Sequence, residues 1–120
     1  MGVRRVELSR DLEPGQLWWA RPDPSVGREE SGRRPVLVLA GREFLRTVDT
    51  LVMVAPLTTV DRGWPNHVAV GEVEGLPRHS LVMTEQVRTI SRRRLDGWIG
   101  DVDERCLAEA RRWVVDYLSG

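Results

Sequence analysis

Short apolar runs separated by polar turns fill the chain up to about residue 101. The first strand is predicted to begin at Leu17 and to stop at Arg21, just before the turn residues Pro22–Asp23–Pro24. The second is the continuous apolar run 35–40, which starts on a proline, at a position where a missing amide donor is tolerated. Runs of apolar and β-branched residues predict further strands at 51–57, 67–70, 80–85, 87–90 and 98–100.

The C-terminal segment has the pattern of a helix. Asp103 is a good N-cap, and Glu104 suits the positive end of the helix dipole. Val102 and Leu107 have the spacing of a hydrophobic staple. The apolar stripe that follows is wider than packing on one sheet requires, so we expect part of it to bury against a second copy of the protein. It comprises Cys106, Leu107, Ala110, Trp113, Val114, Tyr117 and Leu118.

These elements predict one domain at residues 15–120, preceded by a charged N-terminal extension at residues 1–14. The extension ends in Pro14–Gly15 and has no hydrophobic period, so we expect it to be loosely attached. Short strands separated by turns with glycine or proline favour a small barrel or sandwich, carrying the final helix. Trp18 and Trp19 are expected to point to opposite faces of their strand, and Trp98 and Trp113 to be packing residues.

The composition restricts the class of protein. With 120 residues, 41% of them apolar and 30% charged, the chain fits one soluble globular domain. Cys106 is the only cysteine, which excludes an internal disulfide and a cysteine-based zinc cluster. Neither a membrane-spanning apolar run nor a signal-peptide apolar region is present, so we expect a cytoplasmic protein without membrane contact.

The charges balance, at 18 basic against 18 acidic residues, so no overall field indicates a nucleic-acid partner. Every basic residue is an arginine. Codon usage accounts for this total more simply than phosphate recognition does, although the guanidinium is well suited to forking onto a phosphate. The local clustering of arginines is therefore more informative than their number.

Several kinds of site can be set aside. The sequence has no P-loop and no Gly-x-Gly-x-x-Gly fingerprint. His67 and His79 have no second ligand at metal-binding spacing, so no metal site is expected. Ser80 directly follows His79, and neighbours in a strand point to opposite faces, so they do not form a nucleophile–base pair.

An arginine and a threonine remain as candidates for chemistry. Arg34 ends a polar loop where an apolar strand begins, and Thr58 ends another apolar strand. If the two strands are neighbours, a guanidinium and a hydroxyl could meet at one sheet edge, bind a phosphate and stabilise a pentacoordinate transition state. The alternative is that Arg34 is a solvated charge in a loop and that the Thr58 hydroxyl only makes a hydrogen bond to the local backbone. Spacing alone favours this alternative.

Residues 84–89 place a carboxylate, an amide and a guanidinium between two apolar stretches. Gln86 and Arg88 are suited to reading base edges, and Glu85 could accept a proton. A β-bulge with a buried Arg–Glu pair would explain the same residues equally well. Trp64, beside Pro65 in a loop, is the tryptophan best placed to stack on a base.

The order and spacing of these motifs resemble those of the MazF/PemK family, the ribonuclease toxins of bacterial toxin–antitoxin systems. The resemblance begins with Gly-Gln-Leu-Trp-Trp at 15–19 and the loop and strand at 23–38. It continues through 55–58, 75–77, 79–81, 85–90, 99–100 and the final helix, so that it covers residues 15–118.

The resemblance implies an SH3-like β-barrel with a C-terminal helix, working as a homodimer with RNA along the dimer face. It implies sequence-specific cleavage of single-stranded RNA without a metal or other cofactor, leaving a 2′,3′-cyclic phosphate and a 5′-hydroxyl. A cognate, MazE-like antitoxin would lay an acidic tail across the same surface. The competing hypothesis is a non-catalytic inhibitor, such as a CcdB-like gyrase poison, or an antitoxin-binding module of the same fold.

The family motif assigns the catalytic pair to Arg34 and Thr58. The arginine would serve proton transfer and phosphate neutralisation, and the threonine would stabilise the developing charge. In the related toxin Kid, a histidine, an arginine and an aspartate are the catalytic residues instead. Here Arg28, Met83 and Glu85 stand at those positions, so that only the carboxylate is kept. Glu85 is therefore expected to be a structural or substrate-binding residue. The residues expected to bind RNA are Glu29, Arg33, Trp64, Ser80, Gln86 and Arg88.

Overall fold

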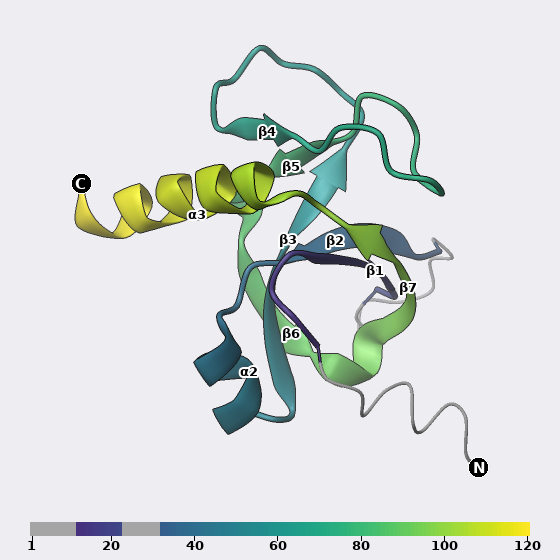
Figure 1. The fold of residues 1–120 in the computed structure, drawn as a ribbon, viewed down its shortest axis with the longest axis vertical. Helices are drawn as coiled ribbons and strands as arrows, with labels where there is room; N and C mark the ends of the chain where they lie inside the picture. The colour runs from purple at the N-terminus through teal and green to yellow at the C-terminus, as the bar shows by residue number, and fades with distance from the viewer. Residues whose placement is uncertain (1–11, 23–31) are drawn as a thin grey trace.

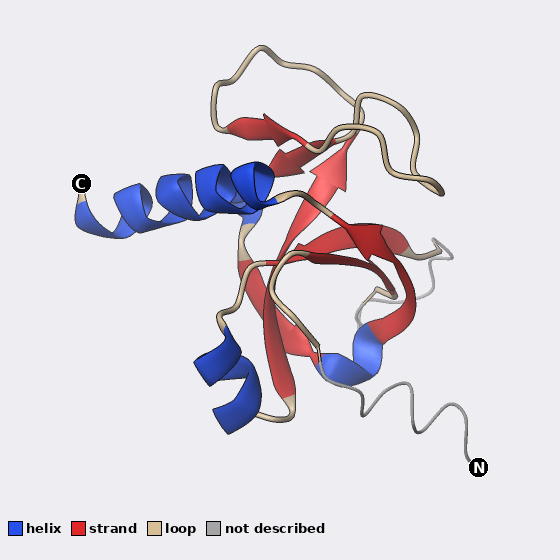
Figure 2. Cartoon of the chain, viewed as in Figure 1, coloured by secondary structure: helices blue, strands red, loops and turns tan. Residues whose placement is uncertain are grey.

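The computed structural model describes residues 12–22 and 32–120. They form a mainly antiparallel sheet with strand order β4-β5-β3-β2-β1-β7, and β6 pairs with β3 beside this path. A long C-terminal helix packs on one side of the sheet, and a short helix follows β2 (Figures 1 and 2). The strands are β1 Gln16–Ala20, β2 Arg34–Val38, β3 Leu51–Thr58, β4 His67–Ala69, β5 Leu81–Met83, β6 Arg88–Ser91 and β7 Leu95–Asp101. The helical elements are α2 Arg42–Thr47, the 3-10 turns η2 Thr84–Gln86 and η3 Arg92–Arg94, and α3 Glu104–Ser119.

Strand alternation divides the core into two clusters. On β2, Val36 and Val38 lie in one cluster while Leu37 lies in the other. We call the first the β6-side core, which also holds Trp18, Val52, Val54 and Ile90. We call the second the helix-side core, which also holds Leu17, Ala55, Val82, Cys106 and Ala110. Because successive side chains of a strand point to opposite faces, the central strands contribute to both cores at once.

The helix α3 begins as the sequence predicts. The Asp103 side chain accepts a hydrogen bond from the backbone N–H of Cys106 at 2.9 Å, which caps the helix. Arg111 donates to the carbonyl oxygens of Leu39 and Ala40 at 3.1 and 3.3 Å and ties the middle of α3 to the chain after β2. The end of the helix then projects beyond the sheet (Figure 1), and Leu118 is 84% exposed.

The barrel expected from the sequence is only loosely realised. Among the described residues, β4 and β7 are the outer strands of the sheet path and do not pair with each other. The strand predicted at 80–85 is shorter, because the chain turns into η2 at Thr84. Trp18 is buried and Trp19 faces the other side, as predicted, but Trp98 is 57% exposed rather than a packing residue. Part of the stripe on α3 is likewise exposed.

The ordered packing begins before the predicted domain boundary at residue 15. Leu12 is buried in the β6-side core, next to the part of the chain that carries Leu45. Glu13 forms an ion pair with Arg42 at 3.0 Å, which joins this segment to α2. At least residues 12 and 13, which the sequence assigned to the extension, therefore take part in the domain; residues 1–11 lie outside the described part of the chain. No helix in the described ranges has the length and apolar character needed to cross a membrane.

Replacing Leu12 by alanine should lower the free energy of unfolding by about 2 kcal/mol, because it removes buried methyl groups from the β6-side core. The matched control is Leu118→Ala, at a site that is 84% exposed, where the change should stay within about 0.5 kcal/mol. Urea denaturation of both variants measures the difference. Equal losses in the two variants would contradict the packing assigned to Leu12.

Candidate functional site

A groove of about 380 Å³ opens on the same face as the β6-side core. Four arginines and one glutamine line it, and no carboxylate is among its described lining residues. The groove therefore concentrates positive charge in a protein whose net charge is zero. Its lining residues are Ala20, Arg21, Pro22, Gly32, Arg34, Val36, Val54, Pro56, Met83, Gln86, Arg88, Ile90 and Arg94.

The pairing of β2 with β3 sets Arg34 and Thr58 on one face of the sheet. The strands are antiparallel with Val36 opposite Pro56, and this register continued by two residues sets Arg34 opposite Thr58. Arg34 lines the groove, as do Val36 and Pro56. Thr58 lies two residues after Pro56 on β3, so strand alternation directs its side chain to the same face. The condition stated from the sequence, that the two strands are neighbours, is therefore met.

The hydroxyl of Thr58 also makes the local bond that the alternative interpretation required. Its Oγ1 accepts a hydrogen bond from the backbone N–H of Val60 at 3.1 Å. A threonine hydroxyl has one hydrogen and two acceptor lone pairs, so this contact leaves the hydrogen available. The backbone bond thus orients the hydroxyl without using the proton that an anion would need.

Arg34 and Arg88 enter the groove from β2 and β6 with exposed side chains. Within the described ranges, neither guanidinium has a hydrogen bond or an ion pair with the protein. Gln86, on η2, is also exposed and lines the groove. Of the residues predicted to act on RNA, the groove brings together Arg34, Gln86 and Arg88.

The sequence analysis did not identify Arg21 or Arg94 as groove residues. Arg94 donates from Nε to the carbonyl oxygen of Arg21 at 2.8 Å, which joins the end of β1 to the start of β7. Arg21 also forms an ion pair with Asp96 at 3.1 Å. The run Arg92–Arg93–Arg94 is visible in the sequence, but only the fold determines which of its members faces the groove.

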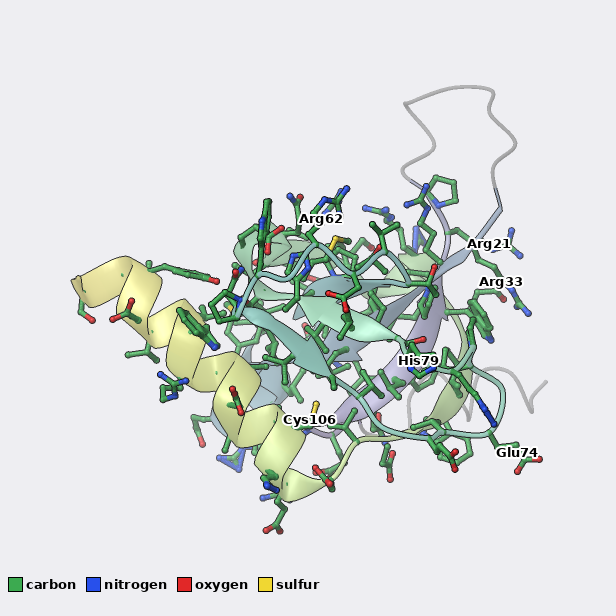
Figure 3. All side chains as sticks on the ribbon, turned by 90° about the horizontal axis from the view of Figure 1, so that it is seen from above. Arg21, Arg33, Arg62, Glu74, His79 and Cys106 are labelled. Atoms are coloured by element: carbon green, nitrogen blue, oxygen red, sulfur yellow. The ribbon has the colours of Figure 1, made fainter. Side chains whose placement is uncertain are left out.

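Two other predicted residues, Arg33 and Ser80, are not among the groove-lining residues. Arg33 stacks on Trp19, with its guanidinium carbon 4.9 Å from the ring centre, and pairs with Asp96 at 3.3 Å. Figure 3 shows Arg33 beside Arg21 at one end of the molecule, where both reach Asp96. Ser80 is 2% exposed and donates its hydroxyl hydrogen to the carbonyl oxygen of Pro77 at 2.8 Å.

Trp64 and Glu29 are the remaining residues that the sequence predicts to bind RNA. The Trp64 ring is 47% exposed, lies 5.0 Å from the ring of His67 and is covered in part by Arg62. It is accessible, as base stacking would require, but it is not among the groove-lining residues. Glu29, and Arg28 beside it, lie outside the described residues.

Glu85 faces away from the groove and pairs with a buried histidine. Its two carboxylate oxygens lie 3.0 and 3.1 Å from Nε2 of His67, and Asn66 donates to one of them at 2.9 Å. The alternative of a buried Arg–Glu pair is therefore wrong, since the partner of Glu85 is His67 and Arg88 is exposed. Burial raises the pKa of Glu85, but the hydrogen bond and electrostatic attraction from His67, together with hydrogen bonds from the backbone and Asn66, outweigh burial and lower the pKa below its ordinary value of 4.5.

Neither a reactive cysteine nor a cluster of metal ligands is found among the described residues. Burial and the neighbouring Asp103 and Glu109 raise the pKa of the Cys106 thiol to about 11, so it is not a thiolate nucleophile at neutral pH. In residues 12–22 and 32–120, no three His, Cys, Asp or Glu side chains are grouped so that they could hold a metal ion.

Comparison with known proteins places the chain in a family. Residues 13–118 match the family described as "PemK-like, MazF-like toxin of type II toxin-antitoxin system". Endoribonuclease EndoA of Bacillus subtilis is 32% identical over 98 residues, which are 80% of this chain and 84% of that protein. The endoribonuclease toxin MazF of Escherichia coli is 32% identical over 78 residues, 64% of this chain and 66% of that protein.

Solved structures agree with this match. The crystal structure of MazF from Deinococcus radiodurans superposes with a TM-score of 0.75 at 26% identity, covering 93% of this chain and all of that one. The Mycobacterium tuberculosis toxin MazF-mt6 superposes with a TM-score of 0.68 at 30% identity, covering 87% and 96%. The chain belongs to the PemK-like, MazF-like family of type II toxins, as its sequence motifs indicated.

The Glu85 carboxylate should stabilise the fold near neutral pH and not in acid. A pKa below the ordinary value of 4.5 means that the stabilisation is fully present above that value. It is lost as the pH falls through the lowered pKa of the folded state. Guanidinium denaturation should therefore show Glu85→Gln less stable than the unmodified protein at about pH 6, with the difference shrinking toward about pH 3. The exposed Glu72→Gln serves as the control, and a difference that grew in acid would contradict the assigned pairing.

Proposed function

We propose that the protein is a sequence-specific endoribonuclease toxin that cleaves single-stranded RNA in the groove containing Arg34. The observation that carries the proposal is the register of β2 and β3, which directs Arg34 and Thr58 to one sheet face. Arg34 is one of four arginines that line the groove on this face, and Thr58 is not itself a lining residue. Membership of the toxin family supports it, and the relatives EndoA and MazF are both named endoribonucleases.

In the proposed reaction the ribose 2′-oxygen attacks the adjacent phosphorus and the bond to the 5′-oxygen breaks. The 2′-hydroxyl loses its proton and the departing 5′-oxygen gains one, so the step consumes no water, oxidant or metal ion. The products are a 2′,3′-cyclic phosphate and a 5′-hydroxyl. Both reactants belong to the RNA, so the protein supplies orientation and charge stabilisation.

Arg34 and Thr58 would divide this work. The guanidinium of Arg34 would serve proton transfer and neutralise the charge that develops on the phosphoryl oxygens, with a hydrogen bond toward the departing oxygen. The Thr58 hydroxyl, held by the N–H of Val60, would donate its free hydrogen to a phosphoryl oxygen. Both groups belong to neighbouring strands of one ladder, which fixes the backbone that carries each of them.

Gln86 and Arg88 are proposed to contact the bases and the backbone of the bound strand. An amide and a guanidinium offer the paired donors and acceptors that base edges require. Arg21 and Arg94 would extend the positive surface along the phosphates. Trp64 remains a candidate for stacking on a base at the edge of the site, and Glu29 a candidate for substrate contact. Arg33 and Ser80 are less suited, because their polar groups are engaged elsewhere.

The positive charge of the groove also bears on which partners the protein would bind. A positive groove that binds the RNA backbone also fits an acidic peptide, and the family is described as the toxin of a toxin–antitoxin system. We therefore propose a cognate, MazE-like antitoxin that covers the groove, a homodimer as the working state and a cytoplasmic location. A CcdB-like gyrase poison is the less favoured alternative, because it needs neither Arg34 nor Thr58.

The purified protein should cut a long single-stranded RNA in the presence of EDTA, and Arg34→Ala should reduce the rate by at least about 100-fold. The reason is the loss of the charge that stabilises the transition state. Thr58→Val should show a similar loss, whereas Thr58→Ser, which keeps a hydroxyl, should retain most activity. Mapping of the new ends should find cyclic phosphates and 5′-hydroxyls.

Arg46→Ala is the matched control, because Arg46 is an exposed arginine on α2 that pairs with Glu43 and lies outside the groove. Its activity should equal that of the unmodified protein. Intact RNA after incubation with antitoxin-free protein would refute the enzymatic function. Full activity in Arg34→Ala would refute the mechanism and leave the function standing.

Binding of a non-cleavable 2′-deoxy strand should weaken with salt, because each arginine on a phosphate releases a counterion. Replacing Arg88 or Arg94 by alanine should reduce the slope of log K against log salt by about 0.7 if that arginine contacts a phosphate. Fluorescence anisotropy across a salt series measures the slope. An unchanged slope with reduced affinity would instead assign the residue to a base contact.

A further inference from the structure

The turn η2 places two consecutive residues on opposite sides of the chain. Gln86 lines the groove together with Met83, which directly precedes the turn. Glu85, between them, is not a groove-lining residue and is directed at His67 on β4. The position of Gln86 in the groove is therefore set by whatever holds the rest of this turn.

The first of these contacts comes from His67. Its side chain is 2% exposed, and its Nε2 lies 3.0 and 3.1 Å from the two oxygens of Glu85. The ring of Trp64 covers it, with 5.0 Å between ring centres. Asn66 adds a third hydrogen bond to the same carboxylate at 2.9 Å. A carboxylate with three contacts of this kind is oriented much more firmly than a free surface glutamate.

The second set of contacts acts on the preceding residue, Thr84, which is completely buried. Its hydroxyl donates to the carbonyl oxygen of Asn66 at 2.8 Å and lies 2.5 Å from the hydroxyl of Tyr117. Tyr117 belongs to the C-terminal half of α3, so the helix reaches the turn directly. Thr84 and Glu85 are thus held from β4 and from α3, while Gln86 is left exposed toward the groove.

We propose that Glu85 is a positioning residue and not a general acid or base: together with His67 and Tyr117, it fixes η2 so that Gln86 presents its side chain to the RNA. This inference rests on the proposed endoribonuclease function. Glu85 touches neither the groove nor Arg34. Its effect on the reaction passes through the turn that it orients.

Steady-state cleavage of a short RNA that contains one site tests the proposal. Glu85→Ala should raise KM on the order of tenfold, the effect expected when a side chain that reads a base edge is displaced, and should leave kcat in place. Glu85→Gln keeps an oxygen that can accept from His67, so its KM should rise less. Tyr117→Phe, which removes only the hydroxyl, should raise KM in the same direction, and Glu72→Gln should change nothing.

A general acid or base would give the opposite pattern. Glu85→Gln would then lose kcat as severely as Glu85→Ala, and the pH profile of kcat would lose one limb. That result would overturn the proposal. So would an unchanged KM in both Glu85→Ala and Tyr117→Phe, provided that circular dichroism shows both variants folded.

A second readout separates this inference from the proposed function. The side-chain amide signals of Gln86 in a nitrogen-15 spectrum of the free protein should shift in Glu85→Ala and remain in place in Glu72→Gln. If the unmodified protein does not cut RNA, the proposed function fails, and the Gln86 signals still decide whether Glu85 holds the turn. Unchanged signals in Glu85→Ala would refute the positioning role even in an active enzyme.

Discussion

The antiparallel register between β2 and β3 is the constraint on which the rest of the structure depends. It sets Val36 opposite Pro56 and thereby fixes which side chains of both strands face each way. A slip of one residue would exchange the two faces, turning Arg34 toward the face of the helix-side core and Leu37 toward the groove face. The alternating apolar residues on both strands therefore protect the site as well as the core, because burial of a guanidinium without a partner would be very costly.

The consecutive residues Arg33 and Arg34 show how the fold separates the roles of identical side chains. Arg33 packs on Trp19 and pairs with Asp96, so its charge is compensated within the domain. Arg34 opens into a groove whose described lining contains no carboxylate. A chain with no net charge can thus present a strongly positive surface at one place. Acidic residues are directed elsewhere, as in the loop that carries Glu72 and Glu74.

Local chemistry made most of the fold predictable from the sequence. Apolar runs located the strands within a few residues, and the capping chemistry of Asp103 located the start of α3. The placement of Arg34 and Thr58 on neighbouring strands was foreseen only as a condition, because strand adjacency is not a local property. The roles of Arg94 and of His67 were missed for a similar reason: each acts with a residue more than a dozen positions away, and no periodicity encodes such contacts. Trp98 shows the converse error, since a large apolar ring need not be buried.

The helix α3 is unevenly supported along its length, and this has a dynamic consequence. Its first half is anchored by buried Cys106 and Ala110, whereas its last turn carries no basic residue and has Asp116 near the negative end of the helix dipole. Backbone amides should therefore exchange with solvent along a gradient, slowly near Ala110 and rapidly beyond Tyr117. Because the hydroxyl of Tyr117 sits at the boundary between these regimes, fraying of the terminal turn would be transmitted directly to Thr84.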